Sequence, residues 1–185
     1  MIKYVPNILT IARFFFIPFI VQALIEEEYV LAIILYSLSS LTDVIDGLIA
    51  RKFNAISDIG KVLDPLADKS TQISVFLTLG LKGMVDIWII AILLIKDLLM
   101  IIGGTFLYKK EYVVSSKWYG KATTVLIYVT VISSLLIKQF NWYRFDKYLY
   151  YVILVFAIYS FVKYTKFFVK DGYLEEKEVK RSSKN

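Results

Sequence analysis

The sequence of 185 residues contains neither cysteine nor histidine. The lack of cysteine excludes disulfide bonds and thiolate nucleophiles, and the lack of both residues excludes the usual zinc sites. An imidazole base is excluded as well, so a general base is expected to be a carboxylate or a lysine. Any metal site must use oxygen ligands, which favours Mg²⁺, Mn²⁺ or Ca²⁺.

Charged residues are also scarce. They make up 21% of the chain, whereas hydrophobic residues make up 58%. Soluble domains are about 45–50% apolar even when glycine is counted. The sequence therefore predicts an integral membrane protein. The formal net charge of +6 does not indicate nucleic-acid binding, because the basic residues lie at the ends of apolar segments, as membrane orientation requires.

Six apolar segments are long enough to cross a membrane, which takes about 20 residues. They lie at about 7–26, 29–51, 61–80, 85–107, 119–138 and 146–169. We predict an all-α bundle of six transmembrane helices within residues 1–169, followed by a polar, frayed cytoplasmic tail at 170–185. Pro65 is expected to mark the start of the third helix or a kink in it.

The lysines and arginines are distributed unevenly between the two ends of these segments. With both termini in the cytoplasm, 17 of the 22 basic residues fall inside, four fall outside and Lys96 lies within a span. This asymmetry predicts cytoplasmic termini for a multi-pass protein of the cell membrane. The acidic residues Glu26–Glu28 then lie in an external loop.

A polar stretch from Ser40 to Ser70 carries five aspartates between apolar flanks. Asp43 and Asp46 share one face of the second helix, and Asp64 and Asp68 share one face of the third. A polar turn between the helices would make an antiparallel hairpin on which the two acidic faces meet. Carboxylates within a bilayer need their charge neutralised, and divalent cations can neutralise it. We therefore predict a metal site at the inner edge of the membrane.

The residues beside these acids allow two interpretations. Gly47, Ala50 and Gly60 permit either close helix packing or the approach of a nucleotide to the backbone. Arg51 is either an interfacial anchor or a partner for a phosphate beside the metal. A metal and an arginine at a membrane surface suggest phosphoryl transfer on a lipid, with Asp68 as the base.

The aspartate region resembles the motif D-x2-D-G-x2-A-R-x8-G-x3-D-x3-D of the CDP-alcohol phosphotransferase family. Every spacing is kept across 26 residues, at Asp43, Asp46, Gly47, Ala50, Arg51, Gly60, Asp64 and Asp68. The resemblance implies transfer of a substituted phosphate from a CDP-linked donor to an alcohol, with release of CMP, at a site open to the cytoplasm. It also implies six helices and a homodimer.

The resemblance assigns roles to these residues. The four aspartates would bind a pair of divalent ions, Mg²⁺ or Mn²⁺, and Asp68 would also act as the base. The nucleotide and its phosphates would contact the four other motif positions, Gly47, Ala50, Arg51 and Gly60.

The stretch "VPNILTIARFFFIP" looks like the N-terminal signature of the phosphatidylglycerophosphate synthase and cardiolipin synthase branches. Asn7, Thr10 and Arg13 lie broadly on one side of the first helix. They are expected either to line the nucleotide pocket or to serve as a helix start and an interface anchor.

Three lysines are candidates for binding an acceptor phosphate. Lys117 and Lys121 lie in "SKWYGKATT", which matches a pattern of both branches, although positive-inside anchoring explains them equally well. Lys96 has fewer alternatives, because a lysine within a span is costly without a role. Its neighbour Asp97 is not assured as its partner, because adjacent helical residues do not face each other.

The expected donor is CDP-diacylglycerol and the expected acceptor is sn-glycerol 3-phosphate. Phosphatidylglycerol, the acceptor of cardiolipin synthase, is the alternative, because "IIGGTF" lacks an arginine that the glycerophosphate branch usually carries. An ion-coupled transporter is a more distant alternative, since membrane acids often mark ion paths. The acids cluster at one face and no inverted repeat is visible, which argues against transport.

Overall fold

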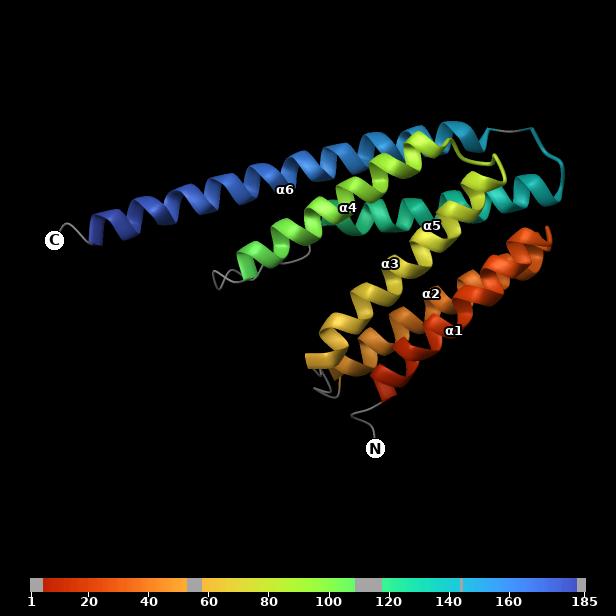
Figure 1. Ribbon diagram of the computed structural model, residues 1–185, viewed down its shortest axis with the longest axis horizontal. Coiled ribbons are helices and arrows are strands. Elements are labelled where there is room, and N and C mark those ends of the chain that lie inside the picture. The colour runs from red at the N-terminus through yellow and green to blue at the C-terminus, as the bar shows by residue number, and fades with distance from the viewer. Residues whose placement is uncertain (1–4, 53–57, 109–117, 144, 183–185) are drawn as a thin grey trace. The chain divides into compact units, whose positions relative to one another are not determined.

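The computed structural model describes the backbone of residues 5–52, 58–108, 118–143 and 145–182, and side chains within 10–45, 48–49, 63–100, 120, 122–143 and 145–166. These residues form six α-helices and no β-strand (Figure 1). The helices are α1 (Val5–Ile25), α2 (Tyr29–Lys52), α3 (Asp58–Leu81), α4 (Ile87–Tyr108), α5 (Trp118–Gln139) and α6 (Asp146–Ser182).

The six predicted apolar segments coincide with these six helices, so the all-α prediction is confirmed. Pro65 lies inside α3, which begins at Asp58, so of the two predicted roles the helix start is excluded and the kink stays a prediction. Pro18 likewise lies inside α1. Membrane helices tolerate internal proline because neighbouring groups satisfy the freed backbone carbonyls. The prediction of a frayed tail is also wrong, because α6 continues through 37 residues to Ser182.

Two described helical stretches are long and apolar enough to cross a membrane, Ala122–Gln139 and Asp146–Lys166. Two shorter apolar stretches, Thr10–Ile25 and Tyr29–Ile45, belong to α1 and α2. Many large hydrophobic side chains are exposed, such as Phe15. A soluble protein rarely exposes such an apolar surface. The exposed residues are therefore suited to contact with lipid.

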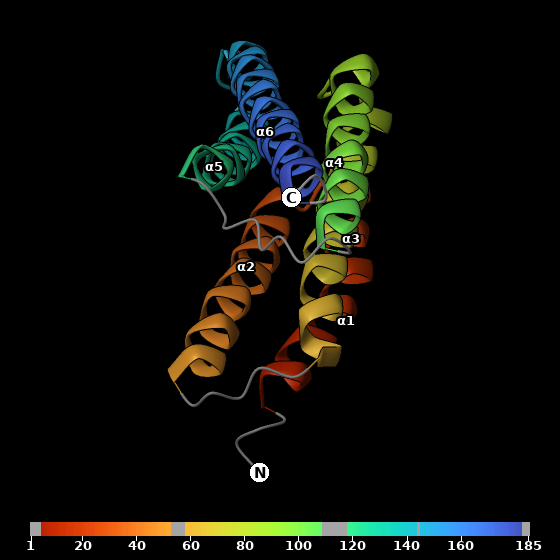
Figure 2. The same ribbon diagram turned by 90° about the vertical axis from the view of Figure 1, so that its left-hand side faces the viewer.

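The chain divides into two compact units, and the first comprises residues Met1–Ile90 and Ile132–Arg144. Within it, α1 packs against both α2 and α3. Figures 1 and 2 show that the start of α1, the end of α2 and the start of α3 lie at the same end of this unit. The antiparallel course of consecutive helices thus brings the predicted motif residues to one end of three packed helices.

Three helix ends in this unit are closed by the same backbone device. The amides of Glu28, Met84 and Trp142 each donate to a carbonyl five residues earlier, at 2.9, 2.9 and 3.0 Å. In each case the preceding residue has a positive φ, 63° at Glu27, 65° at Gly83 and 50° at Asn141. This is the Schellman pattern, in which a left-handed residue lets the chain turn back on the last helical carbonyls. It makes the connections after α1, α3 and α5 compact.

Lys82 ties the end of α3 to the end of α1. Its amine donates to the carbonyl of Ile25 at 2.7 Å and to Oε1 of Glu27 at 3.0 Å. This hydrogen bond and the lysine charge hold the pKa of Glu27 below its ordinary value. The pair therefore satisfies one of the terminal carbonyls that every helix leaves open.

The second unit comprises Ala91–Val131 and Phe145–Asn185. Gly120, near the start of α5, lies against Tyr164 of α6. A Cβ at this glycine would come within 3.2 Å of the tyrosine oxygen, so a larger residue would force the tyrosine to shift. The glycine of the "SKWYGKATT" pattern is thus a point of close helix approach.

Candidate active site

The side chain of Arg13 on α1 reaches two of the predicted motif aspartates. Its Nη1 forms an ion pair with Oδ1 of Asp43 on α2, and its Nη2 lies 3.4 Å from Oδ1 of Asp64 on α3. The arginine side chain is only 2% exposed, whereas those of Asp43 and Asp64 are 43% and 41% exposed. A fork-shaped guanidinium can serve two carboxylates at once. One buried cation therefore joins three helices.

Thr10 lies one turn before Arg13 on α1 and is fully buried. Its hydroxyl donates a hydrogen bond of 2.5 Å to Oδ1 of Asp64, the same oxygen that faces Arg13. Hydrogen bonds to a carboxylate are among the stronger ones in proteins. Thr10 and Arg13 thus hold the Asp64 carboxylate from one side and leave its other side half-exposed. We call Thr10, Arg13, Asp43 and Asp64 the arginine cluster.

Asp68 lies one turn beyond Asp64 on α3 and is half-buried. Asp46, Gly47, Ala50 and Arg51 belong to α2, Gly60 to α3, Asn7 to α1 and Lys121 to α5. Seven of the predicted site residues have side chains outside the described part of the structure. They are Asn7, Asp46, Gly47, Ala50, Arg51, Gly60 and Lys121. Lys117 lies wholly outside them.

The described aspartates have the chemistry that a divalent cation needs. Asp43 and Asp64 present partly exposed carboxylate oxygens, which are hard ligands suited to Mg²⁺ or Mn²⁺. Both reach a single shared cation, the Arg13 guanidinium, so their oxygens already converge on one positive charge. Among the side chains that the structure describes, no three acidic groups converge in this way. The donor set fits a metal that draws further ligands from neighbouring motif residues.

Lys96 and Asp97 form a different ionic arrangement on α4. The Lys96 amine lies 2.5 Å from Oδ1 of Asp97, and their side chains are 13% and 10% exposed. The residues are adjacent in the helix, yet the lysine is long enough to curl back to its neighbour. The sequence alone did not establish that Lys96 and Asp97 form an ion pair, and the structure shows that they do. We call Lys96 and Asp97 the lysine pair.

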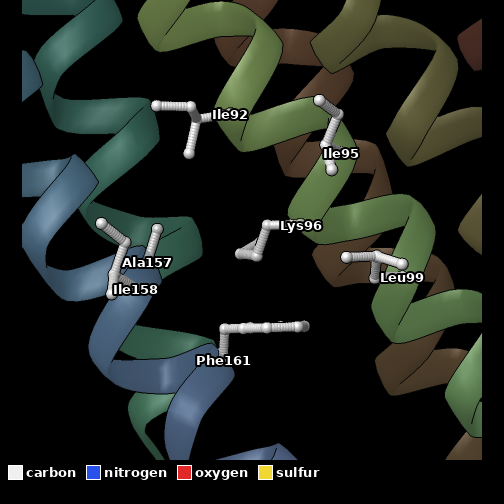
Figure 3. Close-up of a pocket in the computed structure, with 7 residues that line it drawn as sticks. All are labelled: Ile92, Ile95, Lys96, Leu99, Ala157, Ile158 and Phe161. Carbon is white, nitrogen blue, oxygen red and sulfur yellow. The ribbon is translucent and has the colours of Figure 1, made fainter.

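An apolar cavity of about 180 Å³ borders the lysine pair within the second unit. Figure 3 shows side chains of α4 and α6 facing it from two sides. The lining residues are Ile92, Ile95, Lys96, Leu99, Ala157, Ile158 and Phe161. Apart from the Lys96 stem they are hydrocarbon, so this space suits an aliphatic chain better than a free phosphate.

The sequence of the chain is matched by a family of known enzymes. A model of the CDP-alcohol phosphatidyltransferase family matches residues 3–162. The chain belongs to this family. It is therefore an enzyme, a transferase of phospholipid biosynthesis, and the family assignment predicted from the aspartate motif is confirmed. Enzymes of this family use divalent metal ions.

Individual relatives carry two different names. A protein of Aquifex aeolicus is 34% identical over 166 residues, covering 87% of this chain and 93% of its own, and is named a CDP-diacylglycerol–glycerol-3-phosphate 3-phosphatidyltransferase. A Mycoplasma genitalium protein with the same name is 28% identical, covering 70% of this chain and 60% of its own. A Streptomyces coelicolor protein, 28% identical with coverages of 65% and 59%, is named a CMP-forming cardiolipin synthase.

Sequence reasoning missed the central position of Arg13 in the arginine cluster. It appeared only as one of three residues on a helix side that was expected to line a nucleotide pocket or anchor the helix. Its position inside an apolar helix was nevertheless a signal, because an intramembrane arginine needs a partner. Only packing of α1 against both α2 and α3 shows that its partners are the motif aspartates.

Proposed function

We propose that the chain transfers a phosphatidyl group from CDP-diacylglycerol to sn-glycerol 3-phosphate, which yields phosphatidylglycerophosphate and CMP. The observation that carries this proposal is the convergence of Asp43 and Asp64, two motif aspartates 21 positions apart, on one buried cation. The name of the Aquifex aeolicus relative, which aligns over nearly its whole length, supports this donor and this acceptor.

Asp43, Asp46, Asp64 and Asp68 are the residues that would hold the metal, as two Mg²⁺ or Mn²⁺ ions. When bound, divalent ions neutralise a diphosphate and its leaving group. Arg51 would contact the donor phosphates, because a guanidinium binds phosphate oxygens with two donors. Gly47, Ala50 and Gly60 would leave room for the cytidine nucleotide, with Asn7 and Thr10 on the adjoining helix.

The reaction itself is a substitution at phosphorus. The acceptor hydroxyl oxygen bonds to the phosphorus that carries the diacylglycerol, and the bond from this phosphorus to the CMP oxygen breaks. The hydroxyl proton passes to Asp68, the half-buried carboxylate one turn from Asp64. This role for Asp68 requires that at least one of its oxygens faces the acceptor.

The membrane arrangement follows from the charges and the exposed apolar side chains. All six helices would cross the cell membrane, with both termini and the aspartates on the cytoplasmic side, where 17 of the 22 basic residues fall. Residues 1–169 would form the membrane domain and 170–185 a polar cytoplasmic tail. Membrane lipids would contact the exposed faces, and a homodimer is the expected assembly.

The acceptor phosphate is assigned to Lys96, Lys117 and Lys121. A second candidate function, cardiolipin synthase with phosphatidylglycerol as acceptor, is favoured by one observation. The cavity beside Lys96 is lined by hydrocarbon, which suits an acyl chain of a lipid acceptor. The name of the Streptomyces coelicolor relative agrees with this alternative.

The decisive experiment measures CMP release by the purified protein from CDP-diacylglycerol, with each acceptor in turn, and with and without Mg²⁺. Release that requires both Mg²⁺ and sn-glycerol 3-phosphate is the expected result. Release only with phosphatidylglycerol would replace the first acceptor by the second. An absence of CMP under all conditions would overturn the proposed reaction and leave an ion-coupled transporter to be tested by ion flux.

A further inference from the structure

The Arg13 guanidinium lies against the two described carboxylates that would bind a divalent cation. It contacts Oδ1 of Asp43 and Oδ1 of Asp64, one of the two oxygens that each residue could offer a metal. Oδ1 of Asp64 also accepts the Thr10 hydroxyl at 2.5 Å, so this oxygen already has two donors. A carboxylate oxygen has a limited number of acceptor positions. The arginine and a metal would therefore draw on the same two carboxylates.

The charge balance favours exchange over coexistence. Two carboxylates face one guanidinium, so the three groups together keep one negative charge. A divalent ion would neutralise the two carboxylates completely. It would also repel a guanidinium held against the same oxygens, because like charges a few ångströms apart interact strongly in a protein interior.

We propose that Arg13 is a resident counter-ion that exchanges with the divalent cation. In the metal-free protein the guanidinium neutralises Asp43 and Asp64 and holds α1 against α2 and α3. When a cation binds, the guanidinium leaves these oxygens. This inference rests on the proposed role of both aspartates as metal ligands, and it adds that their affinity for metal is set by the arginine.

The alternative role for Arg13 makes the opposite prediction. If the arginine only held the two ligands in position, its removal would disorder them and weaken metal binding. If it competes with the metal, its removal strengthens binding. The sign of the change in metal affinity thus separates a competitor from a structural support.

The first test measures the Kd for Mn²⁺ of the full-length protein in detergent, without substrate, from the free Mn²⁺ signal in electron paramagnetic resonance. Arg13→Met is expected to lower this Kd roughly tenfold, and Arg13→Lys, which keeps the charge, by less. Lys82→Met is the matched control, because it removes a cation from the Glu27 ion pair, and its Kd should equal that of the wild type. An unchanged or raised Kd in Arg13→Met would overturn the exchange.

The second test uses the wild-type protein and does not depend on the folding of Arg13→Met. The chain has only four arginines, at positions 13, 51, 144 and 181, so a spectrum of ¹⁵N-arginine-labelled protein has few Nε–H signals. The Arg13 signal is assigned by its loss in Arg13→Lys. Titration with Mg²⁺ is expected to shift it.

The two tests also separate this inference from the proposed function. Binding of Mn²⁺ or Mg²⁺ without movement of the Arg13 signal would overturn the exchange and leave the metal site intact. If the wild type binds neither ion, both the proposed metal site and the proposed exchange are wrong.

Discussion

The arginine cluster and the lysine pair solve the same problem in different ways. Both place a cation and carboxylate within hydrophobic helices, where an unpaired charge is costly. The arginine cluster draws its members from three helices, across 30 residues from Arg13 to Asp43 and 51 from Arg13 to Asp64. The lysine pair is formed by two adjacent residues of one helix.

This difference decides what each ion pair can contribute. The ion pair between Lys96 and Asp97 joins residues of the same helix, so this ion pair does not itself connect two helices. A cluster across three helices makes packing and charge interdependent, because the carboxylates are neutralised by the arginine only when α1 lies against α2 and α3. Loss of the guanidinium should therefore lower stability, whereas loss of one carboxylate charge should mainly lower turnover.

The largest expected effect is on turnover when the arginine cluster loses a carboxylate charge. Asp64→Asn keeps an oxygen that can accept the Thr10 hydroxyl, so folding should persist, but a metal ligand is lost. We expect CMP release to fall on the order of 10²–10³-fold. The measurement is initial CMP release at saturating Mg²⁺. Asp97→Asn in the lysine pair provides the comparison and should lose far less; an equal loss, or substantial activity in Asp64→Asn, would contradict the assignment.

The next effect concerns stability without metal. Arg13→Met leaves Asp43 and Asp64 facing each other without their cation, but both are more than 40% exposed and remain solvated. We expect the free energy of unfolding to fall by about 1–3 kcal/mol, less than for a fully buried pair. Thermal unfolding in detergent, followed by circular dichroism, measures this change. Added Mg²⁺ should remove most of the difference from wild type, and a difference independent of Mg²⁺ would argue against a shared role.

A smaller effect is expected from the lysine pair. Lys96→Met should raise the KM for the acceptor roughly tenfold, as loss of one charged contact does, with little change in the KM for CDP-diacylglycerol. Steady-state CMP release, with one substrate varied at a time, measures both constants. The double variant Lys96→Met/Asp97→Asn controls for the loss of the Lys96 charge beside the Asp97 carboxylate. Equal increases in both KM values would contradict the proposal that Lys96 binds the acceptor.

The smallest effect concerns the ion pair of Lys82 and Glu27, which lies at helix ends and serves as a comparison with the arginine cluster. The lysine lowers the pKa of Glu27 below its ordinary value of 4.5. The stabilisation is therefore fully present above pH 4.5 and is lost as the pH falls through the lowered pKa in the folded state. Lys82→Met should unfold at a slightly lower temperature than wild type at neutral pH, and the two proteins should converge on acidification. A difference in unfolding temperature that persists at acidic pH would show that the Glu27 ion pair is not its cause.

Much of this protein follows from local patterns in its sequence. The apolar segments predicted the bounds of the first five helices and the start of the sixth to within a few residues, because an apolar run long enough to span a bilayer favours a helix of that length. The spacing of the aspartates predicted the family, because the motif is fixed by positions along two consecutive helices. The sequence analysis ended the sixth helix at the last apolar residue and missed its continuation to Ser182, because it followed hydrophobicity and not the helix propensity of the glutamates and lysines beyond.

What the sequence determined by itself is the hydrophobic pattern, the helices and the presence of acids that need neutralisation. Only the tertiary structure decided which side-chain cation lies against these acids, namely the Arg13 guanidinium beside Asp43 and Asp64. From the sequence, divalent cations were expected at these acids, and Arg13 was expected to line a nucleotide pocket or anchor a helix. Nothing in a one-dimensional pattern gives the distance between side chains on different helices. The packing of α1 against α2 and α3 brings Arg13 to both Asp43 and Asp64, because a buried guanidinium is stable only where carboxylates meet it.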